Sequence, residues 1–175
     1  GAFSGASADL PVGTVIGAGT TKTVPVTFKP TTAGAATGSW TIATDGVLNV
    51  VSNKGSSYLS GVVTNYGKVV WRSGNSSTWY WMNGTRLENM PGALVEVQLD
   101  GGLHRGPAGP GVFNNAGTLL KSGGSGGSAY TAFQPGFVFN NTGLVDVQRG
   151  TVRFTDGFTS AAPFSLATNT AVELA

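Results

Sequence analysis

The chain has 175 residues, only 10% of them charged, and a formal net charge of +2. Ordinary soluble domains have about 25% charged residues, so this composition, with 28 glycines, is typical of packed strands and tight turns. Dispersed Lys and Arg residues exclude a basic nucleic-acid-binding patch, the absence of cysteine excludes disulfides and thiolate metal sites, and the Gly, Ser and Asn in the uncharged stretch 122–145 exclude a membrane span there.

Residues 1–45 have a different pattern from the rest of the chain. Alternating apolar residues predict two strands, with Val24, Val26 and Phe28 in the first and Trp40 and Ile42 in the second. The run 24–46 resembles the C-terminal half of the Hydin-type immunoglobulin-like sandwiches of large bacterial surface proteins. Such domains have roughly 100 residues, so the resemblance implies an incomplete, antiparallel β-sandwich segment over residues 1–45.

Residues 46–175 repeat with a period of about 25 residues, within the range typical of solenoids. Each repeat has an Asn- and Gly-containing turn followed by an apolar strand, and the turn glycines recur at nearly equal intervals: Gly67, Gly92, Gly117 and Gly143. Such a period predicts stacked units that bury their apolar faces against one another. We expect an all-β fold with a short right-handed parallel β-helix, its four glycines in line and its interior formed by Val95, Leu120 and Val145.

These Asn-x-Gly turns followed by short valine-rich strands resemble the repetitive β-helical passengers of bacterial autotransporters and filamentous adhesins. The resemblance covers residues 46–175. It implies export, exposure at the cell surface, and a structural or adhesive role.

Two ladders of side chains are predicted along the stack, because residues at equal positions in adjacent strands lie about 4.8 Å apart. The turn asparagines predict an amide ladder at one corner, or else serve only as turn formers: Asn65, Asn89, Asn115 and Asn141. Four charged residues predict an outward ladder of alternating charge, or else are unrelated solvated charges: Arg72, Glu96, Lys121 and Asp146. Exposed pairs contribute at most about 1 kcal/mol each, so such a ladder would set the register of the strands more than their stability.

Glycine-rich insertions are expected to leave the stack at one place, over residues 74–84, 101–111, 123–136 and 148–150. In solenoids such insertions often form the binding face. The first insertion contains Trp79, Tyr80 and Trp81, for which two interpretations are open. The aromatic side chains form an exposed platform for a sugar, or Trp79 and Trp81 bury against a neighbouring surface while Tyr80 points away.

Candidates for catalysis are few. His104 is the only histidine, and no nucleophile-elbow serine accompanies it. Glu96 and Asp146, two coils or about 9.6 Å apart, lie at the outer limit for an inverting glycosidase pair, which keeps a polysaccharide lyase or hydrolase as a minor alternative. We expect no enzyme, no metal and no cofactor. Asn75, Asn83 and Asn140 begin N-glycosylation sequons, which also arise by chance in a chain rich in Asn, Ser and Thr.

Together these patterns predict an extracellular structural protein that assembles with itself into a fibre or surface layer. Solenoid ends expose open strand edges, and the strands 24–28 and 40–44 lack sandwich partners, so we expect them to pair with an adjoining subunit. Two alternatives remain. The chain is a fragment of a longer protein that supplies the missing strands itself, or it is a carbohydrate-binding adhesin fragment whose partner is a polysaccharide.

Overall fold

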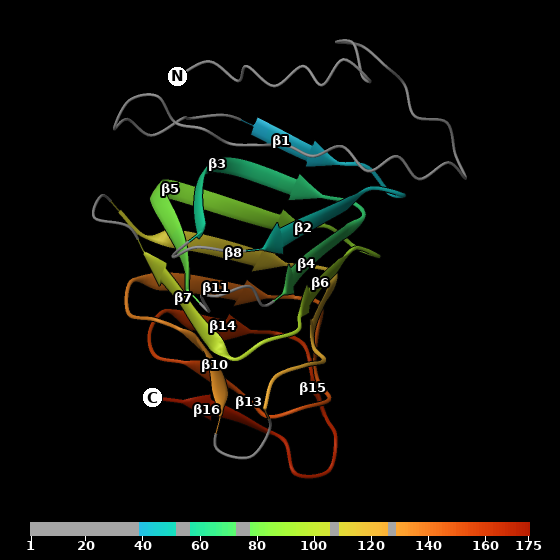
Figure 1. Ribbon diagram of the computed structural model, residues 1–175, viewed down its shortest axis with the longest axis vertical. Helices are drawn as coiled ribbons and strands as arrows, with labels where there is room; N and C mark the ends of the chain where they lie inside the picture. Colours follow the sequence, from blue (N-terminus) through green and yellow to red (C-terminus); the bar gives the residue numbers. More distant parts are fainter. Residues whose placement is uncertain (1–38, 52–56, 73–77, 106–108, 126–128) are drawn as a thin grey trace. The chain divides into compact units, whose positions relative to one another are not determined.

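The computed structural model describes residues 39–51, 57–72, 78–105, 109–125 and 129–175. These residues form a parallel β-solenoid of about five turns, with about 24 residues per turn (Figure 1). The described part of the chain contains strands and no helix, and hence no helix that could cross a membrane. The predicted all-β stack of coils is confirmed.

Each turn places one strand on each of three faces, here called faces A, B and C. Face A contains β1 (Ser39–Ile42), the second halves of β3 (Ser57–Asn65) and β5 (Thr78–Asn89), β8 (Gly111–Asn115), β11 (Phe137–Asn141) and β14 (Phe158–Ser160). Face B contains β2 (Val47–Val51), β4 (Lys68–Arg72), β6 (Leu94–Val97), β9 (Thr118–Lys121), β12 (Leu144–Val147) and β15 (Phe164–Leu166). Face C contains the first halves of β3 and β5, β7 (Gly101–Arg105), β10 (Tyr130–Phe133), β13 (Thr151–Phe154) and β16 (Ala171–Leu174).

Faces A and C belong to one ten-stranded sheet, whereas face B is a separate six-stranded sheet. The two larger faces are continuous because β3 and β5 run around the corner between them. They pass that corner near Gly61 and Gly84, whose φ angles of 94° and 70° are rarely adopted by other residues. The pairing register of β3 and β5 shifts at the same place, between Ser60 and Val62.

Face C lies where the sequence predicted surface insertions. β5 begins at Thr78, β7 occupies residues 101–105 and β10 occupies residues 130–133, all inside those ranges. The prediction of free insertions is therefore wrong for these segments. Glycine and polar residues obscure the strand pattern, but Leu103 and Phe133 point inward and are buried, which is enough to hold the strands on the core.

β1 is a strand of the solenoid rather than of a separate sandwich. It pairs in parallel with β3, with Ser39 opposite Val62 and Ile42 opposite Asn65. Trp40 and Ile42 pack against the solenoid core, so the solenoid extends to residues before 46. The antiparallel arrangement predicted for this strand is incorrect. Val24, Val26 and Phe28 lie outside the described residues.

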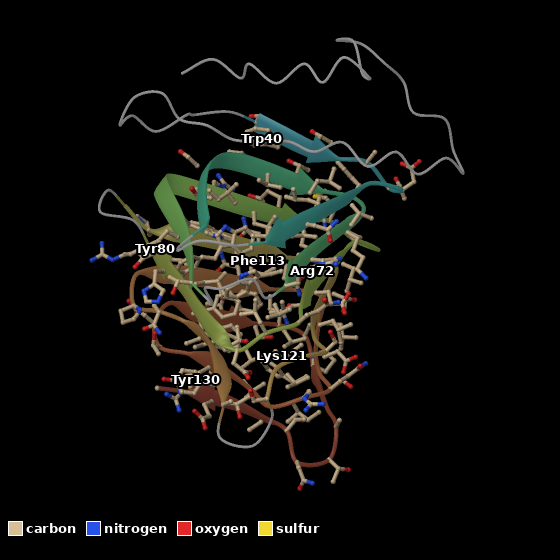
Figure 2. The ribbon with its side chains drawn as sticks, in the orientation of Figure 1. Trp40, Arg72, Tyr80, Phe113, Lys121 and Tyr130 are labelled. Atoms are coloured by element: carbon tan, nitrogen blue, oxygen red, sulfur yellow. The ribbon has the colours of Figure 1, made fainter. Side chains whose placement is uncertain are left out.

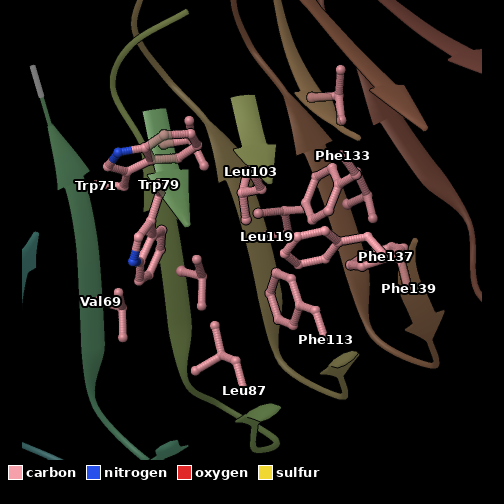
Figure 3. Close-up of a cluster of buried hydrophobic side chains, with 14 of the residues drawn as sticks. Val69, Trp71, Trp79, Leu87, Leu103, Phe113, Leu119, Phe133, Phe137 and Phe139 are labelled. Atoms are coloured by element: carbon pink, nitrogen blue, oxygen red, sulfur yellow. The ribbon is translucent and has the colours of Figure 1, made fainter. Parts of the chain in front are cut away.

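The core is a continuous stack of large apolar side chains enclosed by the three faces (Figure 3). Tryptophans fill its earlier turns, with ring centroids of Trp71 and Trp79 separated by 5.6 Å. Phenylalanines fill the later turns, where Phe133 and Phe154 stack at 4.8 Å. Full burial of one such side chain stabilises the fold by about 1.5–3 kcal/mol, so this column is the main source of cohesion between turns.

Candidate functional site

The corner between faces A and B carries the asparagine ladder. The side-chain amide of Asn65 donates to Asn89 Oδ1 at 2.8 Å, that of Asn89 to Asn115 Oδ1 at 2.7 Å, and that of Asn115 to Asn141 Oδ1 at 2.7 Å. The same amides also donate to the carbonyls of Leu94, Thr118 and Leu144. All four asparagines are buried. The predicted ladder is present, and its members bind one turn to the next instead of serving only as turn formers.

The ladder ends on a different residue type. The side-chain amide of Asn141 donates to the Ser160 hydroxyl at 3.0 Å. Asn169, which follows the last visible repeat signature, lies at another corner, between faces B and C, with a left-handed φ of 61°.

The glycine column beside this ladder contains one alanine. Lys68 pairs with Leu94 and Leu94 with Thr118, so the residue in line with Gly67 and Gly117 is Ala93. The predicted position of Gly92 is wrong because the turn between Asn89 and Leu94 is two residues longer than the turn between Asn115 and Thr118.

The interior residues of face B differ from the prediction at one position. The strand register makes Leu119 the buried residue and turns Leu120 outward, whereas Val95 and Val145 are interior as expected.

Face B does not carry the predicted ladder of alternating charge. Glu96 and Asp146 share one outward column, but Leu120 lies between them. Lys121 lies in the inward column between Val97 and Val147. The predicted ladder placed Lys121 in line with Arg72, whereas the strands pair Trp71 with Val97 and Val97 with Lys121, so Lys121 lies in line with Trp71. A slip of one residue moves a side chain to the opposite face of a strand.

Arg72 is also outside the Glu96 column. The residue of β4 that pairs with Glu96 is Val70, two positions before Arg72. The Arg72 guanidinium instead donates to Asn49 Oδ1 at 2.5 Å.

Glu96 is the most strongly held carboxylate on face B. Lys68 Nζ lies 2.6 Å from its Oε2, and the Gln98 amide and Ser122 hydroxyl donate to Oε1 at 2.8 and 2.6 Å. Burial raises the pKa of Glu96, but these hydrogen bonds and the charge of Lys68 outweigh burial and lower the pKa to about 2. A carboxylate ionised at neutral pH cannot donate the proton that the acid of a glycosidase pair supplies.

Lys121 is a buried residue that connects two turns through hydrogen bonds, rather than an exposed charge. Its Nζ donates to the Leu99 carbonyl at 2.9 Å, to Asp100 Oδ1 at 3.0 Å and to the Gly123 carbonyl. Burial lowers the pKa of Lys121, and the adjacent Asp100 opposes that effect. Burial raises the pKa of Asp100, but donors from Ser125 and Lys121 lower it overall. Each charge is compensated, as a buried ion pair requires.

Trp79 and Trp81 are core residues, with exposed fractions of 3% and 0%. Their ring centroids lie 5.5 Å apart in an edge-to-face arrangement. An exposed sugar platform made of these two tryptophans is therefore excluded. The alternative interpretation is correct in its geometry, since both rings are buried and the alternation of the strand turns Tyr80 outward, but the surface that buries them is the chain's own core.

The remaining predictions concern His104, metal ligands and the asparagines of the glycosylation sequons. Burial lowers the pKa of His104, whose ring centroid lies 5.2 Å from that of Tyr80. Within the described ranges, no group of three or more His, Cys, Asp or Glu side chains could hold a metal ion. Asn75 lies outside the described residues, and Asn83 is described only as part of the backbone of β5.

A second, outward ladder on face A was not predicted. Asn114 donates to both carboxylate oxygens of Glu88 at 2.9 Å, Asn140 donates to Asn114 Oδ1 at 2.8 Å, and Thr159 donates to Asn140 Oδ1 at 2.9 Å. The amide that glycosylation of Asn140 would modify is thus already hydrogen-bonded. The Asn-Asn pairs at 114–115 and 140–141 were the available signal, because both members recur together one repeat apart.

Comparisons with family models, curated proteins and solved structures found no match to this chain. The β-solenoid agrees with the type of fold that the resemblance to β-helical passengers implied. That agreement concerns the fold alone.

Proposed function

We propose that this chain is an extracellular structural protein that assembles with copies of itself into a fibre or surface layer. The observation that carries the proposal is the apolar end of the solenoid. Leu166 and Leu174 are 50% and 66% exposed, although the residues before them in the same inward columns, Val147 and Phe154, are 0% and 1% exposed.

Another layer of strands would cover this end. β14, β15 and β16 each have a neighbour on one side only among the described strands. Open strand edges above an apolar column can accept strands of a second molecule, and a head-to-tail contact that does not close forms a filament. We assign the covering layer to a second copy of this chain.

Three features support a structural and extracellular role. The asparagine ladder and Lys121 form hydrogen bonds between successive turns, and the buried tryptophans fill the core, so these side chains have structural roles. The low charge content suits lateral packing of fibres, and the resemblance to autotransporter passengers implies export. Pairing of the 24–28 strand with a neighbouring subunit stays a prediction.

Sedimentation velocity over a range of protein concentrations tests the assembly. We expect the unmodified chain to form oligomers that grow with concentration, and Leu166→Lys or Leu174→Lys to yield monomers, because each buries a charge in the contact. Ser165→Lys is the matched control, since Ser165 is exposed on the same strand and lies in the outward column beyond Asp146. A chain that stays monomeric at all concentrations, or equal loss of assembly in Ser165→Lys, would contradict the proposal.

A further inference from the structure

The outward side of face C gathers polar aromatic residues. Tyr80 in β5 pairs with His104 in β7, and their ring centroids lie 5.2 Å apart with the planes tilted by 38°. Tyr130 in β10 is 38% exposed. Figure 2 shows Tyr80 and Tyr130 on the same side of the stack.

Two small, buried residues, Gly102 and Ala132, separate the pair Tyr80 and His104 from the pair Tyr130 and Arg153. Gly102 pairs with Ala132, and Ala132 pairs with Arg153. The His104 imidazole lies over Gly102, since a Cβ at that glycine would come within 3.0 Å of the ring. Any larger residue at position 102 would lift the imidazole off the sheet. The two pairs therefore lie along a strip that runs obliquely over β5, β7, β10 and β13. It spans three strand spacings or about 14 Å across the strands, and Tyr130 lies four residues before the register position of His104.

The charges of the side chains along the strip nearly cancel. The Arg153 guanidinium lies 3.9 Å from the Tyr130 ring centroid and forms a 2.6 Å ion pair with Glu173. Burial lowers the pKa of His104, so its ring carries no charge at neutral pH. The exposed Arg105 adds a charge only at the edge of the strip, at the end of β7.

We propose that Tyr80, His104, Tyr130 and Arg153 bind a neutral oligosaccharide laid across the strands of face C. A tyrosine ring offers an apolar face with a polar tip, which matches the C–H face and the hydroxyl rim of a sugar. The Arg153–Glu173 pair supplies a donor and an acceptor for hydroxyl groups, as the few polar groups of a ligand site do. This binding is separate from end-to-end assembly, whose apolar contact involves Leu166 and Leu174.

Isothermal titration of the full chain with neutral hexasaccharides tests the inference, using cellohexaose, chitohexaose and xylohexaose as probes and the hexamer of galacturonic acid as the anionic comparator. We expect at least one neutral probe to bind, with affinity reduced at least tenfold in Tyr80→Ala and in Tyr130→Ala. Tyr80→Phe should retain most of the affinity because it keeps the stacking ring.

Tyr66→Ala is the matched control, because Tyr66 is 44% exposed but lies at the corner between faces A and B. It should bind as the unmodified chain does. The inference is overturned if no neutral probe binds at millimolar concentration, if only the anionic probe binds, or if Tyr66→Ala loses as much affinity as Tyr80→Ala. Circular dichroism of each variant confirms that the fold is kept.

Discussion

At the scale of single residues, buried polar side chains hold this solenoid in register. Asn115 accepts a hydrogen bond from Asn89 and donates to Asn141 Oδ1 and to the Leu144 carbonyl. It is 1% exposed, so water cannot replace these partners. A buried polar group that loses its partner retains the full desolvation penalty, and the ladder is therefore more sensitive to truncation than its net hydrogen-bond energy suggests.

Asn115→Ala should destabilise the fold strongly, and the adjacent Asn114→Ala should not. Removing Asn115 leaves the Asn141 oxygen and one Asn89 donor without their side-chain partners, and we expect a loss of about 3 kcal/mol. Asn114 is only partly buried on the outward side, so water can satisfy its partners and the loss should be about 1 kcal/mol or less. Urea unfolding followed by circular dichroism measures both. Equal losses would show that the inner ladder has no special role.

At the scale of elements, turn length decides which residues stack. The turn from Asn115 to Thr118 lies so close to the preceding turn that a Cβ at Gly117 would come within 3.0 Å of the carbonyl oxygens of Ala93 and Met90. Gly92, in the longer turn, has open space around it but a φ of 82°. Gly117 is therefore required by the approach of the neighbouring turn, and Gly92 by its own backbone conformation.

Gly117→Ala should cost more stability than Gly92→Ala. Overpacking against main-chain atoms that cannot move aside costs about 3 kcal/mol, whereas an alanine in the left-handed region costs about 1–2 kcal/mol. Thermal unfolding of the two variants under the same conditions gives the comparison. If Gly92→Ala proves the more damaging change, the register that places Ala93 in the glycine column is in doubt.

At the scale of the whole molecule, charge contacts between turns make stability depend on pH. Glu96 in β6 joins Lys68 in β4 to Ser122 after β9, so one carboxylate connects three successive turns. The folded-state pKa of Glu96 is about 2, below its ordinary value of 4.5. Its contribution is therefore fully present above pH 4.5 and is lost as the pH falls from 4.5 towards 2.

Acid should accordingly weaken the fold by about 3 kcal/mol through Glu96 alone, the free energy that corresponds to such a pKa shift. Glu96→Gln should be less stable than the unmodified chain at pH 7 and should lose less stability between pH 5 and pH 2.5. Asp146→Asn is the control, because Asp146 lies in the same outward column but accepts its hydrogen bond from Gln148, two residues away in the same turn. Denaturant unfolding at a series of pH values measures the effect, and an unchanged acid dependence in Glu96→Gln would contradict it.

The sequence alone determined the parallel stack, its period and the asparagine corner. Asn65, Asn89, Asn115 and Asn141 recur at nearly equal intervals, and a fixed period requires that each unit bury its apolar face on the next. Such information is local, since it depends only on residue type and spacing along the chain.

Only the tertiary structure decided which side of each strand faces the core. Leu120 and Lys121 exchange their predicted roles because Trp71 lies in line, through Val97, with Lys121. Face C and the burial of Trp79 and Trp81 also emerged only in three dimensions, because glycine and polar residues hide the strand pattern there. The physical reason is the two-residue period of a strand: a shift of one residue, which sequence spacing cannot resolve across turns of variable length, moves a side chain from solvent to core.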